Sequence, residues 1–427
     1  MKLKVLLGMS GGVDSSVAAA LLLQQGYDVI GVTFKMWPQD CLDRQQDKAC
    51  GPFAMVDARA VAEQLGFPHY VVDEQAQFQK IVIDYFVAEY RAGRTPNPCV
   101  LCNERVKFGA LLEKANALGA DFIATGHYAR VQSSSKSRIN LLRSREPQKD
   151  QTYFLFSLKQ DQLARCLFPL GEITKKQVRA LAAELKLKVA EKEDSQEICF
   201  VPEHDYRRFL REEGKLVSRE GDIVDRTGRV LGHHPGIEYF TIGQRKGLGI
   251  SAPQPYYVVA LEADTNRVIV GNPDELMTQE FFVERPNWIA AGNLECGDLS
   301  PLSRGAIHRP ASIPITSPSR QGGTTQSADE SAHSKTGGTG LPAEAGVPAC
   351  ESIKCTVKIR SQHAGAPCAI SPTSNGRIHV KLDAPERAVT PGQAAVFYDG
   401  DLVLGGGWIS TLPKSSSIPL SKHGGKA

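Results

Sequence analysis

The chain has 427 residues, of which 41% are hydrophobic and 23% are charged, which is ordinary for a globular protein of roughly two or three domains. No run approaches the roughly 18 apolar residues that a membrane helix needs, and the N-terminus lacks the apolar core and cleavage site of a secretory signal. A net charge of +3 is too small to indicate a nucleic-acid partner by itself. We therefore expect a cytoplasmic protein with no membrane segment.

The first 205 residues alternate short apolar runs with helical patterns. Strands are predicted at 4–8, 28–34, 69–72 and 122–126, and helices at 15–25, 57–65, 108–118 and 174–192. This alternation indicates an α/β domain, in which a doubly wound parallel sheet carries helices on both faces. Functional residues in such sheets lie at the carboxyl ends of the strands.

The composition changes after residue 205. Short β-type runs now alternate with Gly, Pro and Asp turns, at 221–224, 256–261, 268–270, 355–360, 378–382 and 394–398. We expect a small mixed domain over 206–280 and a β-barrel-like domain over 281–412. Within the latter, residues 309–350 are rich in Ser, Thr, Gly, Pro and Ala and are predicted to be a disordered insertion, while 413–427 is predicted to be a flexible tail.

A glycine-rich loop, GMSGGVDSS at residues 8–16, follows the first strand and opens the first helix. Ser10, Gly11 and Gly12 offer backbone amides to a phosphate, and the helix N-terminus adds a partial positive charge. The loop is neither a Walker loop nor a dinucleotide fingerprint. An ordinary tight turn with capping serines is the alternative, but paired glycines before Asp-Ser-Ser favour an ATP site in which Asp14 holds Mg²⁺.

The ten cysteines are expected to be mostly reduced thiols in a long cytosolic chain. Cys99 and Cys102 form one CxxC pair, and a zinc ribbon would need a second pair that the sequence lacks. The two prolines of TPNPC exclude a helix there and predict a rigid loop ahead of a helix, where a thiol pKa is lowered. A pair of buried thiols is an equally good interpretation.

Cys199 lies in a polar run, DSQEICF at residues 194–200, just past the predicted 174–192 helix. A buried structural cysteine is more often found inside an apolar strand. The alternative is a small core strand, in which Ile198 and Phe200 would flank Cys199.

Taken together, the three motifs resemble those of the bacterial tRNA-specific 2-thiouridylases, members of the ATP pyrophosphatases that share an SGGxDS loop. The resemblance covers nearly the whole chain except 309–350 and the tail. The other shared motifs are TPNPCVLCN (95–103), ATGHYAR (124–130), KDQTYF (149–154), DSQEICF (194–200), GHHPG (232–236), TIGQRKGLG (241–249) and PGQAAVFY (391–398).

The resemblance implies a mechanism. ATP adenylates the C2 oxygen of the tRNA wobble uridine, and pyrophosphate leaves. Cys199 receives sulfur from a carrier protein and holds it as a persulfide, which attacks C2. Cys102 attacks the persulfide, so 2-thiouridine, AMP and a Cys102–Cys199 disulfide result, and a reductant restores the thiols.

The resemblance also assigns binding residues. Those implied for ATP are Gly8, Met9, Ser10, Gly11, Gly12, Val13, Asp14, Ser15, Phe34 and Gly126. Phe34 stands where the family usually has Met against the adenine, and an aromatic ring can stack there.

Residues implied to contact tRNA or the target base are Asn97, Pro98, Cys99, His127, Lys149, Asp150, Gln151, Arg360, Ser361 and Gln393. Arg360 and Gln393 would meet the anticodon stem-loop, and Ser361 replaces an aromatic residue that the family commonly has. Since the wobble base must leave its stack, we expect a deep pocket near Asn97, Cys99 and Cys102.

Two other functions are compatible with the glycine-rich loop. An ATP-dependent amide ligase of the same superfamily would need an ammonia source, and no glutaminase motif is evident. A non-catalytic RNA-binding module would not need the intact loop and both cysteines. AMP formation that depends on tRNA separates the three.

Deleting residues 309–350 is expected to leave tRNA thiolation intact, because this composition cannot bury enough surface to form a core. Thiolation by the deletion variant and by the full chain, measured side by side, checks this. A large loss of activity in the deletion variant would contradict it.

Overall fold

The computed structural model describes residues 2–36, 52–134, 138–193, 198–201, 205–251, 254–290 and 352–410. The predicted insertion at 309–350 and the predicted tail at 413–427 lie outside these residues. In the part of the chain that is described, no helix has the length and apolar character to span a membrane.

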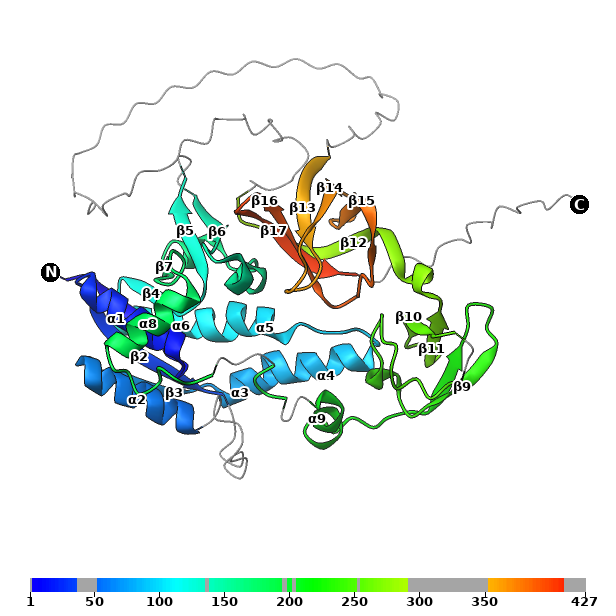
Figure 1. The fold of residues 1–427 in the computed structure, drawn as a ribbon, viewed down its shortest axis with the longest axis horizontal. Coiled ribbons are helices and arrows are strands. Elements are labelled where there is room, and N and C mark those ends of the chain that lie inside the picture. The colour runs from blue at the N-terminus through cyan, green and yellow to red at the C-terminus, as the bar shows by residue number, and fades with distance from the viewer. Residues whose placement is uncertain are drawn as a thin grey trace, which may run out of the picture. The chain divides into compact units, whose positions relative to one another are not determined.

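A five-stranded, entirely parallel sheet forms the first domain (Figure 1). Its strand order is β3-β2-β1-β4-β7. The strands are β1 (Lys4–Gly8), β2 (Asp28–Lys35), β3 (His69–Asp73), β4 (Phe122–Thr125) and β7 (Cys166–Leu167). The predicted doubly wound α/β class is confirmed.

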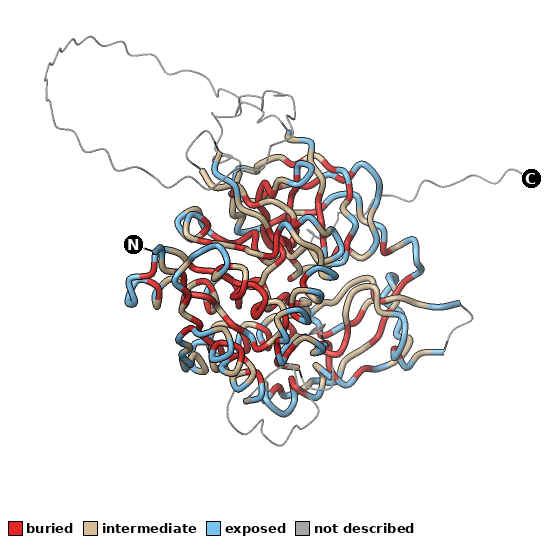
Figure 2. The backbone as a smooth tube through the Cα atoms, turned by 60° about the vertical axis from the view of Figure 1, so that its left-hand side comes forward, coloured by how far each residue is buried: buried red, intermediate tan, exposed pale blue. Residues whose placement is uncertain are grey.

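The helices cover both faces of this sheet because successive side chains of a strand point to opposite sides. Val5 and Leu7 of β1 pack with α1 (Val13–Gln24), α2 (Pro52–Leu65) and α8 (Lys175–Glu184). Leu6, between them, packs on the other face with α6 (Phe108–Leu118). Each face therefore has its own apolar core, visible as buried backbone in Figure 2.

The prediction of a helix over 174–192 is wrong beyond residue 184. Thr174 caps α8 as expected, accepting a hydrogen bond from the backbone N–H of Gln177. The helix ends at Glu184, and Lys186 has a left-handed backbone with φ of 51°. This turn lets Leu187 and Val189 re-enter the core. Core burial thus outweighs the helical periodicity of the last eight residues.

Two long helical runs cross the domain, and each contains a π-helical segment. One is α3 (Gln75–Phe78), η2 (Gln79–Ile83, π) and α4 (Asp84–Arg91). The other is α5 (Pro98–Leu101), η3 (Cys102–Lys107, π) and α6. The prediction that the prolines exclude a helix is wrong at Pro98, because proline at the first helical position lacks only an N–H that would have no intrahelical partner.

Short elements connect these parts. They are η4 (Pro147–Lys149), η5 (Thr152–Phe154), α7 (Gln160–Leu163), α9 (Tyr206–Glu212), η7 (Ile237–Tyr239) and η8 (Pro273–Leu276).

A small four-stranded sheet follows, with the order β10-β11-β8-β9. Its strands are β8 (Gly221–Val224), β9 (Val230–His234), β10 (Tyr257–Glu262) and β11 (Arg267–Gly271). Only β8 and β11 run parallel; the other pairs are antiparallel. The sheet is therefore mixed, as expected.

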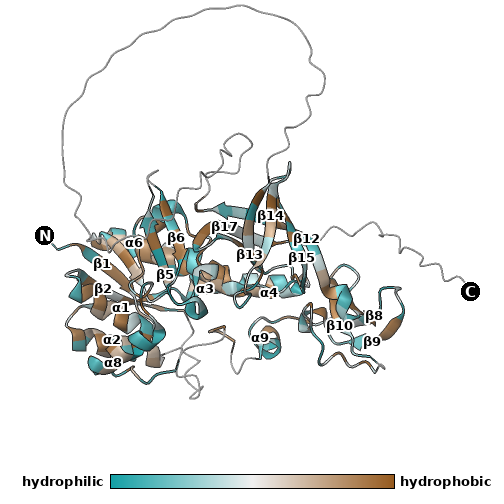
Figure 3. Ribbon diagram, turned by 45° about the horizontal axis from the view of Figure 1, so that its top comes forward, coloured by the Kyte–Doolittle hydropathy of each residue, from teal (hydrophilic) through white to brown (hydrophobic). Residues whose placement is uncertain are grey.

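Six antiparallel strands close into the predicted barrel, since β12 pairs with both β15 and β17. They are β12 (Met277–Trp288), β13 (Ile353–Lys358), β14 (Ala366–Pro372), β15 (Ile378–Arg387), β16 (Ala394–Asp399) and β17 (Leu402–Ile409). Their hydrophobic residues appear as brown stretches in Figure 3.

A hairpin from the first part of the chain extends this barrel sheet. β5 (Ala129–Ser133) and β6 (Ile139–Arg143) join the edge of β17, where Leu142 pairs with Leu402. The Arg130 guanidinium lies 2.7 Å from the Asp401 carboxylate at the same junction. The parallel-sheet domain and the barrel are thus joined by backbone pairing as well as by side chains.

Phe86 on α4 is fully buried, and its ring packs edge-on against Tyr90, Phe200 and Phe209. Phe86→Ala is expected to lower the free energy of unfolding by about 3–5 kcal/mol, because it opens a cavity among these rings. Phe53→Ala, at a 58% exposed phenylalanine of α2, is the control and should change it by no more than about 0.5 kcal/mol. Equal effects in urea unfolding would contradict this assignment of the core.

Candidate active site

The glycine-rich loop lies at the point where the order of the parallel strands reverses. The chain runs from β1 outward to β2 and β3, then returns to β4 on the other side of β1. Gly8 at the end of β1 pairs with Thr125 at the end of β4. Ligands of open α/β sheets bind outside the carboxyl ends of the strands at such a switch point.

Two glycines allow backbone segments to approach closely at this point. A Cβ on Gly126 would lie 2.7 Å from the Ser15 nitrogen. Gly11 has φ of +68°, and a Cβ there would lie 2.1 Å from the Ala54 carbonyl oxygen. No larger residue fits at either position without moving the backbone.

The loop leads into the start of α1, where no side chain caps the helix. Gly12 is the N-cap of α1 and supplies no side-chain cap. The first N–H groups of a helix lack intrahelical partners and favour an anion. Ser10, Ser15 and Ser16 instead hydrogen-bond within the loop, since the Ser15 and Ser16 hydroxyls both donate to the Gly12 carbonyl. Their bonds hold the turn in shape.

Asp14, the predicted metal ligand, is held by two neighbours. The Lys175 ammonium lies 2.8 and 2.9 Å from its two carboxylate oxygens, and the Tyr128 hydroxyl donates to it at 2.8 Å. A second ammonium, that of Lys192, donates to the Gly11 carbonyl at 3.1 Å and to Asp57 at 2.7 Å. The sequence assigned no role at the loop to Lys175, to Lys192 or to Tyr128 of the ATGHYAR motif, because only the fold brings these side chains to it.

Three of the predicted ATP residues frame the loop. Met9 is buried, and its backbone N–H donates to Val32 of the neighbouring strand. Val13 is buried in the core beneath α1. Phe34 is half-buried near the end of β2 and packs at the edge of the core on the α6 face.

Cys99 and Cys102 lie in the first turns of the α5–η3–α6 helix, not in a loop ahead of one. Burial raises the pKa of Cys102 to about 11, against a smaller opposing effect of Lys107. Burial likewise raises the pKa of Cys99 to about 12, and Cys199 and Cys102 add to this. The predicted lowering of a thiol pKa here is therefore wrong, because loss of hydration outweighs the helix N-terminus and the nearby cation.

Cys199 lies close to both of these thiols. Its charge would raise the pKa of each of them, although it belongs to a distant segment of the chain. Cys199 itself is exposed, and the adjacent Phe200 is buried in the same apolar cluster as Cys102. Residues 198–201 form a turn, closed by the Val201 N–H on the Ile198 carbonyl, so the alternative of a small core strand is wrong.

His127 follows β4 and bonds through Nδ1 to the Thr125 hydroxyl at 2.8 Å. Burial, helped by the Lys107 charge, lowers its pKa to about 3. Its ring lies beside those of Phe108 and Phe168. His127 is consequently neutral at physiological pH and acts as a polar, uncharged group.

The segment before the cysteine helix is held by the barrel. The Gln393 side-chain amide donates to the carbonyls of Thr95 and Pro96 at 3.0 and 3.2 Å. The Thr95 N–H donates to the Pro391 carbonyl at 3.0 Å. Asn97 is buried, and its side chain bonds the Tyr153 hydroxyl. Two motifs that lie far apart in sequence, TPNPC and PGQ, are therefore in direct contact.

The remaining predicted tRNA residues lie on the surface or in polar turns. Asp150 accepts bonds from the Ser144 and Thr152 backbone, and Gln151 exchanges bonds with the Tyr128 backbone. Arg360 is exposed, while Lys149, at the end of η4, and Ser361 are half-buried.

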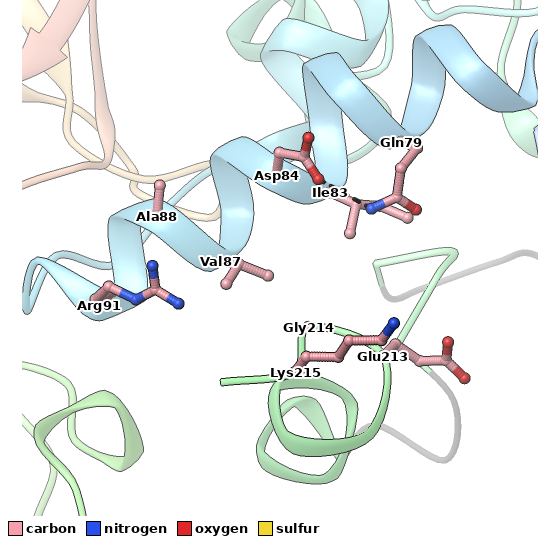
Figure 4. Close-up of a pocket in the computed structure, with 9 residues that line it drawn as sticks. All are labelled: Gln79, Ile83, Asp84, Val87, Ala88, Arg91, Glu213, Gly214 and Lys215. Carbon is pink, nitrogen blue, oxygen red and sulfur yellow. Dashed lines mark hydrogen bonds between the residues drawn. The ribbon is translucent and has the colours of Figure 1, made fainter. Parts of the chain in front are cut away.

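One hollow of about 380 Å³ lies on another part of the molecule. Figure 4 shows side chains of α4, Arg91 among them, on one side and Glu213, Gly214 and Lys215 on the other. Asn97, Cys99 and Cys102 do not line it, so it is not the deep pocket expected around those residues.

Fold and site together define a HUP-type α/β protein with a glycine-rich loop at its switch point and three clustered cysteines. Residues 3–203 match the family described as tRNA methyl transferase HUP domain, 207–272 its PRC-barrel domain, and 344–409 an aminomethyltransferase beta-barrel domain.

Relatives named tRNA-specific 2-thiouridylase MnmA match along nearly their whole length. The chain is 44% identical to that of Geobacter metallireducens over 95% of this chain and 96% of the relative. It is 45% identical to that of Geotalea uraniireducens, over 95% and 94%, and 44% identical to that of Symbiobacterium thermophilum, over 95% and 92%. The chain belongs to the tRNA-specific 2-thiouridylase family.

Iodoacetamide at about pH 7.5 is expected to alkylate Cys199 at least about tenfold faster than Cys102, because Cys199 is exposed and Cys102 is buried and protonated. In a Cys199→Ser variant, Cys102 labelling should keep rising until about pH 11. Peptide mass spectrometry measures both rates. A labelling rate for Cys102 that levels off below pH 9 would contradict the burial argument.

Proposed function

We propose that this enzyme replaces the C2 oxygen of the tRNA wobble uridine with sulfur, consuming ATP and releasing AMP and pyrophosphate. The observation that carries the proposal is that the exposed Cys199 lies near the buried Cys102 in a HUP-type domain. The near full-length similarity to 2-thiouridylases favours thiolation over the methyl transfer in the name of the matched HUP family.

ATP would bind at the switch point. Its phosphates would lie on the N–H groups of Gly11, Gly12 and the first turn of α1. Phe34 and Gly126, at the ends of the flanking strands, would border the adenosine. The uncapped helix N-terminus and the two close glycine approaches support this placement.

Asp14 would hold Mg²⁺. In the described part of the chain, no three His, Cys, Asp or Glu side chains form a metal cluster. A Mg²⁺ ion that keeps one carboxylate and takes its other ligands from phosphates and water fits this arrangement. When bound, the ion neutralises charge on the departing pyrophosphate.

Sulfur would enter at Cys199, because an exposed thiol can meet a protein donor. A sulfur-carrier protein would transfer its terminal sulfur and leave a Cys199 persulfide. That outer sulfur would form a bond to C2 of the adenylated uridine as the bond from C2 to the AMP oxygen breaks. Cys102 would then attack the inner sulfur of Cys199, giving 2-thiouridine and a disulfide that a thiol reductant must reduce.

The raised pKa of Cys102 suits a resolving thiol. A thiol that stays protonated does not compete for the incoming sulfur, and it attacks only after its proton is removed. The neutral His127 and the buried Asn97 border the same region, where the flipped base would lie. The anticodon stem-loop would be contacted by Lys149, Asp150, Gln151, Arg360 and Ser361. Gln393, which bonds the TPNPC segment, would contact it too.

The test is thiolation of a tRNA transcript by the full chain with ATP, Mg²⁺ and a sulfur-carrier protein loaded as its persulfide. Wild type should form 2-thiouridine and AMP, and Cys199→Ser and Cys102→Ser should each lose at least about 99% of the thiolated product, because each removes a sulfur that the reaction needs. Cys355→Ser, in the barrel, is the matched control and should keep full activity.

Two results would overturn the proposal. Thiolation by both variants at the wild-type rate would refute the cysteine roles. AMP formation without any need for tRNA would favour the amide-ligase alternative.

A further inference from the structure

Two lysines converge on the glycine-rich loop from outside it. Lys175 is the first residue of α8, and its ammonium lies 2.8 Å from Asp14. Lys192 follows α8 and contacts both Asp57 and the carbonyl of Gly11. Both lysine side chains are largely buried, at 12% and 15% exposure, whereas the carboxylates they meet are 32% and 35% exposed.

The loop needs such cations because it contains none. Residues 8–16 include one carboxylate, Asp14, and no basic side chain. A Walker loop carries its own lysine to the phosphates. ATP brings about three to four negative charges, and backbone amides alone offset only about half a charge at a helix N-terminus. A bound Mg²⁺ would offset part of this charge, and side chains from outside the loop can supply further positive charge.

The position of Lys175 is unusual for a helix. A cation in the first turn opposes the helix dipole, and α8 has no acidic residue there to compensate. Thr174 caps the helix and the Lys175 N–H donates to the Glu146 carboxylate, so the start of α8 does not need the Lys175 ammonium. Its ammonium is instead directed at the first turn of α1, through Asp14.

The geometry points to Lys175 and Lys192 as the phosphate-binding cations of this ATP site, an inference that rests on the proposed function. The half-buried carboxylates of Asp14 and Asp57 keep the two ammonium groups in place before ATP arrives. Phosphate oxygens then replace the carboxylates on the lysines, and Asp14 is released to the metal. No buried charge is left unpaired at either stage.

A purely structural role is the competing explanation. Lys175 would fasten α8 to α1, and Lys192 would fasten its own segment to α2. A fastener would affect every ligand of the site and the melting temperature together. A phosphate-binding cation would affect only ligands that carry the β- and γ-phosphates.

The experiment measures binding of ATP, pyrophosphate and AMP to the full chain by isothermal titration calorimetry. Lys175→Met and Lys192→Met keep the apolar stem and remove the charge. Each substitution should weaken the binding of ATP and pyrophosphate about 10- to 100-fold. It should weaken the binding of AMP less than about threefold, as expected for loss of charge-assisted hydrogen bonds to phosphate. Lys176→Met and Lys188→Met, at exposed lysines of the same segment, are the matched controls and should bind like wild type.

A second set of variants, made in an Asp14→Asn chain, tests whether Lys175 binds phosphate directly or only neutralises Asp14. An Asp14→Asn chain removes the Asp14 carboxylate that the Lys175 ammonium contacts. Adding Lys175→Met to this chain should still weaken the binding of pyrophosphate at least about tenfold. Lys175→Arg in its place should keep most of the affinity, because it keeps the charge. No further loss in this background would show that Lys175 only balances Asp14, and would overturn its role.

The possible outcomes distinguish the two proposals. If wild type binds neither ATP nor pyrophosphate, the proposed function fails. If wild type binds both and the methionine variants bind equally well, only the lysine inference fails. Equal losses of affinity for AMP and ATP, together with a lowered melting temperature, would show that the lysines have a purely structural role. That result would also overturn the lysine inference.

Discussion

The site depends on hydrogen bonds that join the barrel to the backbone before the cysteine helix. The TPNPC segment contains two prolines, which have no N–H to donate, and the carbonyls of Thr95 and Pro96 precede the helix that begins at Pro98. Gln393 supplies donors to Thr95 and Pro96, and Gly392 approaches the Thr95 carbonyl so closely that a Cβ would lie 2.8 Å away. The helix that carries Cys99 and Cys102 therefore begins at a point that the barrel determines. Pro98 occupies the first helical position, where its missing N–H costs no intrahelical hydrogen bond.

The two cysteines of the proposed reaction differ in burial, and this difference fits their two proposed roles. Cys102 lies in an apolar cluster with Phe86 and Phe200, where loss of hydration keeps its proton on. Cys199 is next to Phe200, whose buried ring anchors a short turn while the thiol stays exposed. The exposed Cys199 is thus accessible to a protein donor, whereas Cys102 is not. The same aromatic cluster contains Cys102 and the residue that follows Cys199.

Electrostatics at the loop follow from the absence of a basic side chain in residues 8–16. The helix N-terminus attracts anions but cannot balance a polyphosphate. Lys175 and Lys192 reach the loop from α8 and from the turn after it, and both are paired with carboxylates. The turn at Lys186, which ends α8 early, is what returns the chain toward Gly11. A departure from helical periodicity therefore has a direct consequence for the site.

Local pattern in the sequence was sufficient for four of the five parallel strands, the mixed small domain, the barrel and the glycine-rich loop, but not for the two-residue β7, because strand and helix periodicity and turn residues act over short stretches. The loop and cysteine motifs pointed to the family before any geometry was known. The tertiary structure decided the rest: the helix at Pro98, the end of α8 at Glu184, the β5–β6 hairpin on the barrel, the raised thiol pKa values and the two lysines. Each of these depends on burial or on a partner distant in the chain, and neither leaves a periodic signal in the sequence.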